Sequence, residues 1–166
     1  MRKLGTMNAN ETTEPASGHG DRHVVPSEDT LRRFTEIARK GQRVAYSIYK
    51  GDADFNGTGL RPYAIYRDLG VAEATAGLVQ AHVIRIKPPI PEDIKTLHYH
   101  DTLFMMMYVL RGAVTVQIDD EDPVTLTAHS MYIQPPGIKH AVLHYSPDFE
   151  VLEINLPADF KTVNVG

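Results

Sequence analysis

Polar and apolar residues alternate along most of the chain after about residue 42, and glycines, prolines or acidic clusters interrupt the alternation. A period of two is typical of half-buried β-strands, because successive side chains point to opposite faces. The strands predicted from this pattern cover residues 43–49, 62–66, 78–86, 96–100, 104–110, 113–118, 123–127, 131–134, 140–145 and 150–156. Many short strands separated by turn signals indicate an antiparallel sandwich or barrel.

A single helical pattern precedes the strands. Ser27 is suited to an N-cap position, and Gly41 is suited to follow the last turn. The apolar residues between them recur at helical spacing, and they are Leu31, Phe34 and Ile37. We therefore expect a short amphipathic helix from Ser27 to Lys40 whose apolar face packs on the barrel or on a second subunit.

The composition bounds the class of protein. Of 166 residues, 42% are hydrophobic and 23% are charged, which predicts a globular chain. Residues 1–26 are polar and lack periodicity, so we predict a flexible arm there and one domain over residues 27–166. The net charge of −4 argues against nucleic-acid binding, and the lack of cysteine excludes thiolate ligands and cysteine nucleophiles. Neither a signal peptide nor a membrane-spanning run is evident, so we expect a soluble cytoplasmic protein.

Three histidines are the main candidates for chemistry. His98 and His100 lie two residues apart in a predicted strand, so they project from one face with Cα atoms about 6.6 Å apart. This spacing suits two imidazoles that share one metal ion. His140 follows a Pro-Pro-Gly turn at residues 135–137 and would supply a third imidazole from a neighbouring strand. The alternative is a metal-free barrel in which these histidines are only hydrogen-bonded.

The spacing of residues around these histidines resembles the two motifs of the cupins, from about residue 86 to residue 156. The first motif reads His98-Tyr99-His100, four residues, Met105, six residues and Gly112. The second motif reads Pro135-Pro136-Gly137, two residues, His140, three residues and His144. The chain departs from the family at four positions, which are Glu92 and His129 in place of glycines, Met105 in place of a glutamate and His144 in place of an asparagine.

The resemblance implies an all-β fold, a jelly-roll β-barrel with a short N-terminal helix and extra N-terminal strands around a core at about residues 79–157. It also implies one divalent transition metal per chain, which would be Fe, Ni, Zn or Cu, with His98, His100 and His140 as ligands. Met105 stands where the family has its carboxylate ligand. We interpret Met105 as an apolar wall residue rather than a ligand for a soft ion such as Cu(I), because methionine is a common core filler.

Several residues are expected to line a pocket beside these histidines, and they are Met105, Met107, His82, Gln134 and His144. His144 shares strand parity with His140 but would lie about 13 Å from it, which is too far for joint ligation. Asp101 would either orient an imidazole or be a solvated turn residue. The candidates for proton transfer are His144, Tyr108 and Glu153, and the sequence leaves the orientation of their side chains open.

Two functions follow from the resemblance. The first is a metalloenzyme with dioxygenase-like, isomerase or decarboxylase chemistry on a small molecule. The second is a non-catalytic cupin that binds a metal or a small ligand as a sensor or store. Three neutral imidazoles leave both charges of a divalent ion uncompensated, so we expect a small anionic ligand in either case. The helix and the extended arm also suggest a homodimer, the commonest oligomer.

Overall fold

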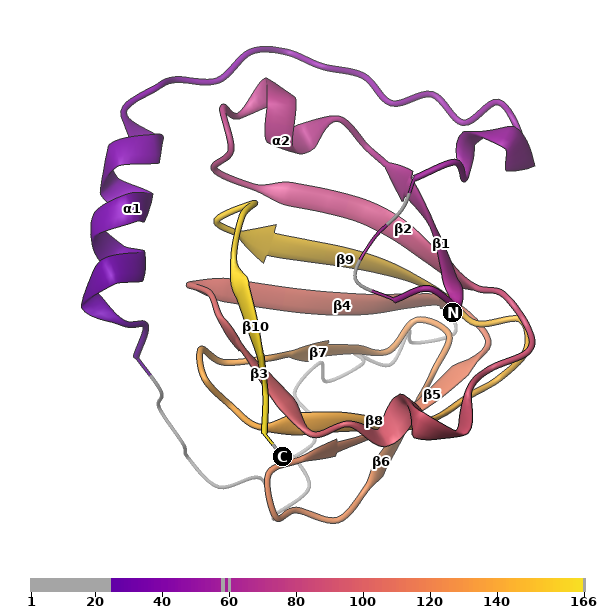
Figure 1. The fold of residues 1–166 in the computed structure, drawn as a ribbon. Coiled ribbons are helices and arrows are strands. Elements are labelled where there is room, and N and C mark those ends of the chain that lie inside the picture. The colour runs from indigo at the N-terminus through magenta and orange to yellow at the C-terminus, as the bar shows by residue number, and fades with distance from the viewer. Residues whose placement is uncertain (1–24, 58, 60, 166) are drawn as a thin grey trace, which may run out of the picture.

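The computed structural model of the protein describes residues 25–57, 59 and 61–165, so the predicted arm lies outside the described residues except for its last two positions. Two five-stranded antiparallel sheets make up the fold (Figure 1). The first sheet has the order β1 (Ala64–Asp68), β2 (Gln80–Ile86), β9 (Glu150–Leu156), β4 (Phe104–Arg111) and β7 (Met131–Ile133). The second has the order β10 (Lys161–Asn164), β3 (His98–Asp101), β8 (His140–Tyr145), β5 (Ala113–Ile118) and β6 (Val124–Thr127).

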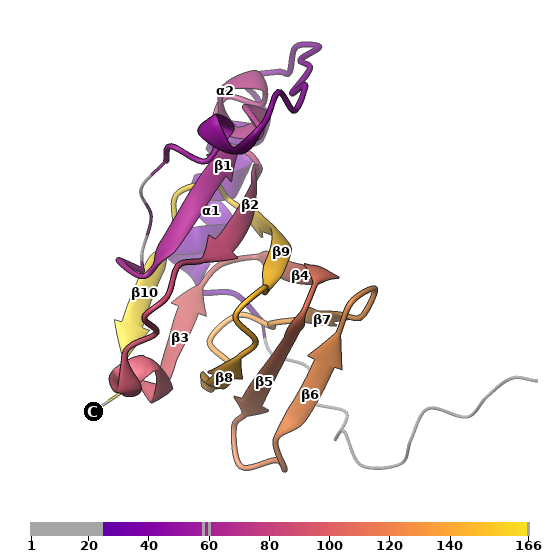
Figure 2. The ribbon, with the colours of Figure 1, turned by 90° about the vertical axis from the view of Figure 1, so that its right-hand side faces the viewer.

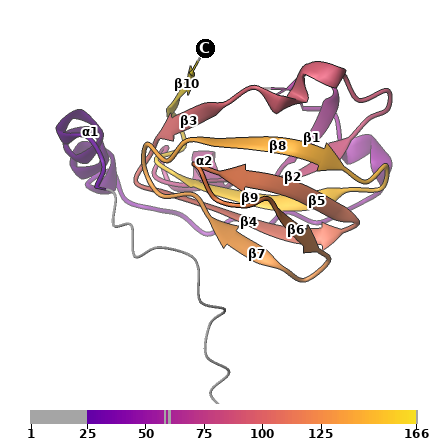
Figure 3. The same cartoon turned by 90° about the horizontal axis from the view of Figure 1, so that it is seen from below.

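The inner faces of the two sheets form the core. Seen from below, β3 and β8 of one sheet lie across from β4 and β7 of the other (Figure 3). Val109 on β4 and Val151 on β9 are register partners with 0% and 2% of their surfaces exposed. Removing such a side chain from water contributes about 1.5–3 kcal/mol. The predicted all-β jelly roll is therefore confirmed, and its inward positions follow the alternation in the sequence.

The predicted strand over residues 43–49 is wrong. This segment is extended but pairs with no strand among the described residues, and it crosses above α2 (Val71–Ala74) in Figure 1. Val44, Tyr46 and Ile48 are 78%, 87% and 75% exposed. Alternation identifies an extended backbone, but a strand also needs backbone hydrogen bonds to a neighbouring strand.

Three short helical elements and one strand were not expected from the sequence. The helical elements are α2, a 3-10 turn at Asp52–Asp54 and another at Glu92–Lys95. The unexpected strand is β10, which pairs with β3 so that Thr162 lies opposite His100. No helix among the described residues is long and apolar enough to cross a membrane.

The predicted helix is present as α1 (Glu28–Ala38), with Ser27 as its N-cap. The hydroxyl of Ser27 accepts a hydrogen bond from the Thr30 amide at 3.2 Å, as N-cap residues do. Phe34 and Ile37 are half-buried, but the expectation for Leu31 is wrong, because 45% of it is exposed. A polar contact fixes the N-terminus of the helix instead.

Asp101 makes that contact, since it accepts hydrogen bonds from Thr30 Oγ1 at 2.9 Å and Ser27 Oγ at 3.1 Å. Thr30 is 1% exposed, so its hydroxyl depends on this partner. The carboxylate also lies at the positive end of the helix dipole. Asp101 therefore attaches α1 to β3 immediately after His100, and it is neither a solvated turn residue nor a partner of an imidazole.

Candidate metal centre

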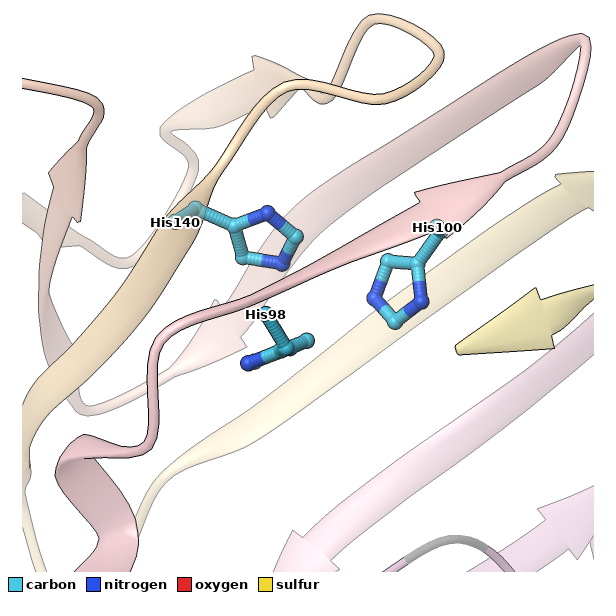
Figure 4. Close-up of side chains that lie close together, drawn as sticks. All are labelled: His98, His100 and His140. Carbon is cyan, nitrogen blue, oxygen red and sulfur yellow. The ribbon is translucent and has the colours of Figure 1, made fainter. Parts of the chain in front are cut away.

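The three predicted ligands come together inside the barrel. His98 and His100 point inward from β3, and His98 is the direct register partner of His140 on β8. The three residues are 3%, 6% and 2% exposed, and Figure 4 shows their rings around a common space. A strand places residues two apart on one face, and the pairing of β3 with β8 supplies the third. The geometry therefore unites the histidines of both sequence motifs.

The rings are close enough to share one ion. Their centroids lie 4.3 Å apart for His98 and His140, 5.0 Å for His100 and His140, and 5.1 Å for His98 and His100. One nitrogen of each ring lies within 4.8 Å of the corresponding nitrogens of the other two. No fourth histidine or acidic residue from the described part of the chain joins this cluster.

Each imidazole is held through Nδ1. His98 Nδ1 lies 2.8 Å from the Thr96 carbonyl oxygen, and His140 Nδ1 lies 3.0 Å from that of Ile138. His100 Nδ1 lies 2.9 Å from Thr162 Oγ1. A carbonyl oxygen only accepts, so Nδ1 of His98 and of His140 carries the hydrogen and Nε2 keeps its lone pair. The two carbonyl partners therefore fix, in His98 and His140, the tautomer that a metal ion requires.

Burial keeps the cluster uncharged. Loss of water and the neighbouring rings of His140 and His98 lower the pKa of His100 to about 3, and loss of water and the ring of His98 lower that of His140 to about 4. The pKa of His98 is also lowered, first by burial. All three rings are therefore neutral near pH 7, which is the form that binds metals.

The donor set fits a divalent transition metal. Three neutral nitrogens with oriented lone pairs suit Fe, Ni, Zn or Cu, and three protein ligands leave positions open for a further molecule. Met105 is 1% exposed and lines the adjoining cavity, where a thioether cancels none of the ion's charge.

A cavity of about 160 Å³ adjoins the rings of His100 and His140. Four of the predicted pocket residues line it, and they are His82, Met105, Met107 and Gln134. This volume suits a ligand of few heavy atoms, because drug-sized ligands occupy about 300 Å³ or more. Gln134 is 2% exposed and its Oε1 has no partner among the described residues, so the cavity wall includes a free hydrogen-bond acceptor.

His144 does not line the cavity, so this expectation is wrong. It is exposed, although it lies four residues after His140 on the same strand. The register of β8 against β5 shifts between the pairs Val116–Val142 and Thr115–His144, which is a β-bulge. An extra residue in one strand reverses the parity beyond it, so His144 points outward.

Glu153 is a cavity residue whose orientation the sequence left open. It projects inward from β9 between Val151 and Asn155, which are both buried. Its Oε1 accepts hydrogen bonds from His82 Nε2 at 2.8 Å and from Asn155 Nδ2 at 3.1 Å. Burial alone would raise the pKa of Glu153, but the His82 contact and the Asn155 hydrogen bond outweigh it and lower the pKa. The signal in the sequence was a charged residue at an inward strand position.

Tyr108, the other residue considered for proton transfer, lies elsewhere. It is on the outer-facing parity of β4, and its hydroxyl lies 3.3 Å from His129 Nδ1 in an exposed contact. Tyr108 is therefore separated from the cavity by the sheet itself.

Sequence reasoning missed Arg61 entirely. One guanidinium nitrogen of Arg61 lies 3.3 Å from His98 Nε2, and another donates to the Tyr63 hydroxyl at 2.8 Å. Arg61 precedes β1 in an irregular segment, so strand periodicity gives no signal for it. Only the folded chain brings this cation to the histidines.

Comparison with solved structures agrees with this architecture, whereas no family model and no curated protein sequence matches the chain. KdgF from a Halomonas species superimposes with a TM-score of 0.51 at 17% identity, over 69% of this chain and 94% of that one. A Klebsiella pneumoniae protein with a double-stranded β-helix domain gives 0.52 at 16% identity, over 74% of this chain and 99% of that one.

Oxalate decarboxylase from Bacillus subtilis is a further structural neighbour, with a TM-score of 0.51 at 21% identity over 67% of this chain. The match spans 31% of the oxalate decarboxylase chain. Identities this low carry information about the fold rather than about activity. The two facing sheets and these neighbours together show that the chain has a double-stranded β-helix fold, which is the fold expected from the resemblance to the cupins.

Proposed function

We propose that the protein is a divalent-metal enzyme that converts a small organic anion, with dioxygenase-like chemistry as its first candidate reaction. The observation that carries the proposal is the convergence of His98, His100 and His140, with one nitrogen of each within 4.8 Å of the others. A divalent ion held there would act as a Lewis acid and offer open positions to a ligand or to dioxygen.

Glu153 favours an enzyme over a passive binding protein. Proton transfer needs an ionisable side chain inside the cavity that can accept and release a proton, and Glu153 is a carboxylate on the cavity wall. Asn155 and His82 orient its Oε1 through hydrogen bonds. Gln80 Nε2 lies 3.4 Å from His82 Nδ1, so Nδ1 accepts and Nε2 donates to Glu153. We propose that Glu153 accepts a proton from the bound ligand.

The remaining lining residues shape the ligand space. Met105, Met107 and Val151 make one wall apolar, which excludes water and strengthens electrostatic contacts inside. With neutral imidazoles as the ligands, an ion at the centre keeps its full charge, so the cavity favours an anion over a neutral sugar or an alkyl chain.

The proposal is tested by loading the purified protein with Fe(II), Ni(II), Zn(II) or Cu(II) in turn and screening small organic acids. Oxygen consumption would reveal oxygenase chemistry, and NMR spectra of the mixtures would reveal isomerisation or decarboxylation. We expect Glu153→Gln to abolish turnover while leaving metal content unchanged. Glu36→Gln, an exposed position on α1, is the matched control and should leave turnover unchanged.

A non-catalytic metal- or ligand-binding cupin is the second candidate function. The small cavity supports it, because a cavity of about 160 Å³ can also store or sense an ion with one small ligand. Saturable binding of an acid with no product from any metal form would favour this function. The cytoplasmic location stays a prediction from the sequence.

We also propose a homodimer. The segment around Val44, Tyr46 and Ile48 has the periodicity of a strand but pairs with no strand among the described residues. The edge strands of the first sheet are β1 and β7, and on β7 Met131 and Ile133 are 45% and 49% exposed. Figures 1 and 2 place this segment at the top and β7 lower in the molecule. A second copy could bring the two together reciprocally, because an added strand completes a sheet edge.

A further inference from the structure

Arg61 makes an uncommon contact at the edge of the three-histidine cluster. Its guanidinium nitrogen at 3.3 Å from His98 Nε2 lies on the side of the ring that Nδ1 does not use. Nδ1 of His98 donates to the Thr96 carbonyl oxygen, so Nε2 is the acceptor in this contact and the guanidinium is the donor. Arg61 thus occupies the lone pair that a metal ion would need.

An ion and this contact exclude each other. A transition metal binds an imidazole nitrogen at about 2.0–2.1 Å along the direction of its lone pair. One lone pair cannot serve both an N–H donor and an ion, and two cations so close together repel. Arg61 must therefore leave His98 Nε2 when an ion binds.

The Arg61 guanidinium forms no ion pair with an acidic side chain among the described residues. No carboxylate from the described residues pairs with Arg61, whose side-chain contacts are with His98 and the Tyr63 hydroxyl. It is half-buried and borders two spaces, the inner cavity and an outer hollow of about 380 Å³ that His98 also lines. A charge withdrawn from water without a partner is costly, so this arginine is suited to bind an anion.

We propose that Arg61 is the residue that selects carboxylate ligands, and that it caps His98 until an ion displaces it. Once displaced, its two parallel N–H groups can bind one carboxylate of a small organic acid held at the three-histidine centre. Binding of the ion and of the acid is then positively coupled, because the acid's negative charge separates the two cations. This inference rests on the proposed function.

Two opposite effects follow from replacing Arg61 by methionine, which removes the guanidinium and keeps an unbranched apolar stem. Calorimetric titration with Ni(II) alone should show about tenfold tighter binding by Arg61→Met than by the unaltered protein, because the cap and the repulsion are gone. Titration of the Ni(II)-loaded proteins with oxalate should show binding weakened by about tenfold or more in Arg61→Met. Oxamide, the neutral analogue, should bind both proteins equally.

Two further variants sharpen the test. Arg61→Lys keeps the charge but not the planar pair of donors, so we expect Ni(II) affinity near that of the unaltered protein and weaker oxalate binding. Arg111→Met removes an exposed guanidinium that pairs with Asp148 on the surface, and it should change neither titration. Tighter Ni(II) binding without any loss of oxalate affinity would overturn the proposed role in ligand selection, and weaker Ni(II) binding would overturn the cap.

A separate measurement distinguishes failure of this inference from failure of the proposed function. In the metal-free protein, the ¹⁵N chemical shift of His98 Nε2 reports whether it accepts a hydrogen bond from Arg61. We expect the shift to change in Arg61→Met and to stay unchanged in Arg111→Met. If the unaltered protein binds no metal but the shift changes in Arg61→Met, the proposed metalloenzyme function is refuted and the contact between Arg61 and His98 is supported. If the protein binds metal but the shift is the same in Arg61→Met, only the contact between Arg61 and His98 is refuted.

Discussion

His98 and His140 face each other directly across the β3–β8 pair, with their ring centroids 4.3 Å apart. They belong to sequence motifs about forty residues apart, and each fixes its Nδ1 on the carbonyl oxygen of the residue two positions earlier. The two rings are thus oriented by the strands that carry them, before any ion binds.

We predict that the protein binds one divalent transition metal per chain and that His98→Ala loses most of it. Removing one of three neutral donors leaves two, which hold an ion weakly. Elemental analysis after reconstitution with Zn(II) measures the effect, and His144→Ala is the control because His144 is exposed on the other face. Equal metal content in the protein and in His98→Ala would contradict a three-histidine site.

Met105→Glu should tighten binding of hard divalent ions and weaken binding of anionic ligands. Met105 lines the cavity beside the histidines, so a carboxylate there adds an oxygen donor and cancels part of the ion's charge. Titration with Mn(II) checks this, and Met105→Gln, which has the same length and no charge, should gain much less. Unchanged Mn(II) affinity in Met105→Glu would show that position 105 cannot reach the ion.

The metal-free protein should lose stability as the pH falls from about 6.5 toward 4. In the unfolded chain an imidazole binds a proton near pH 6.5, whereas burial lowers the pKa of His140 to about 4 and that of His100 to about 3. The unfolded state therefore binds more protons over this interval, and each of the two residues costs about 1.4 kcal/mol per pH unit.

Urea unfolding with a chelator at pH 7 and pH 5 measures this loss of stability. His100→Asn removes one of the two titrating rings, so the difference between the two pH values should be smaller in that variant. The same pH dependence in both proteins would mean that His100 is protonated while the protein is folded.

Asp101→Ala should release the N-terminal end of α1 from the barrel. The change leaves the buried Thr30 hydroxyl without its acceptor, and such a loss costs about 1–3 kcal/mol. Hydrogen exchange should accelerate in α1 more than in β4 or β9. Asp29→Ala, which removes an exposed carboxylate paired with Arg32 on the same helix, is the comparison and should have little effect on the exchange.

Ile133→Lys on β7 should shift a dimer toward monomer in sedimentation velocity, and Tyr46→Lys should do the same. Both side chains are exposed in one chain, and a charge there would be buried in the proposed contact. Leu31→Lys, at an exposed apolar position on α1, should leave sedimentation unchanged. If the unaltered protein is a monomer, or if neither substitution changes its dimer, the proposed pairing of this segment with β7 of a second copy is refuted.

The sequence by itself determined which residues could meet inside the barrel. Alternation placed His98, His100 and Met105 on inward faces, because the period of a strand is fixed by the backbone. The same period located most of the strands, and the spacing of the two histidine motifs pointed to the cupin fold. These are local properties, so they could be derived without knowledge of the neighbouring strands.

Only the tertiary structure decided the rest. The bulge in β8 turned His144 outward. The extra residue in this bulge depends on how β8 pairs with β5, so the local sequence pattern does not predict it. Residues 43–49 have the alternation of a strand, but their backbone pairs with no strand among the described residues. Arg61 lies 37 positions before His98 in an irregular segment, and its contact with that ring depends on how the chain closes around the barrel. The direction of a side chain follows from the local backbone, but its partners follow from long-range packing.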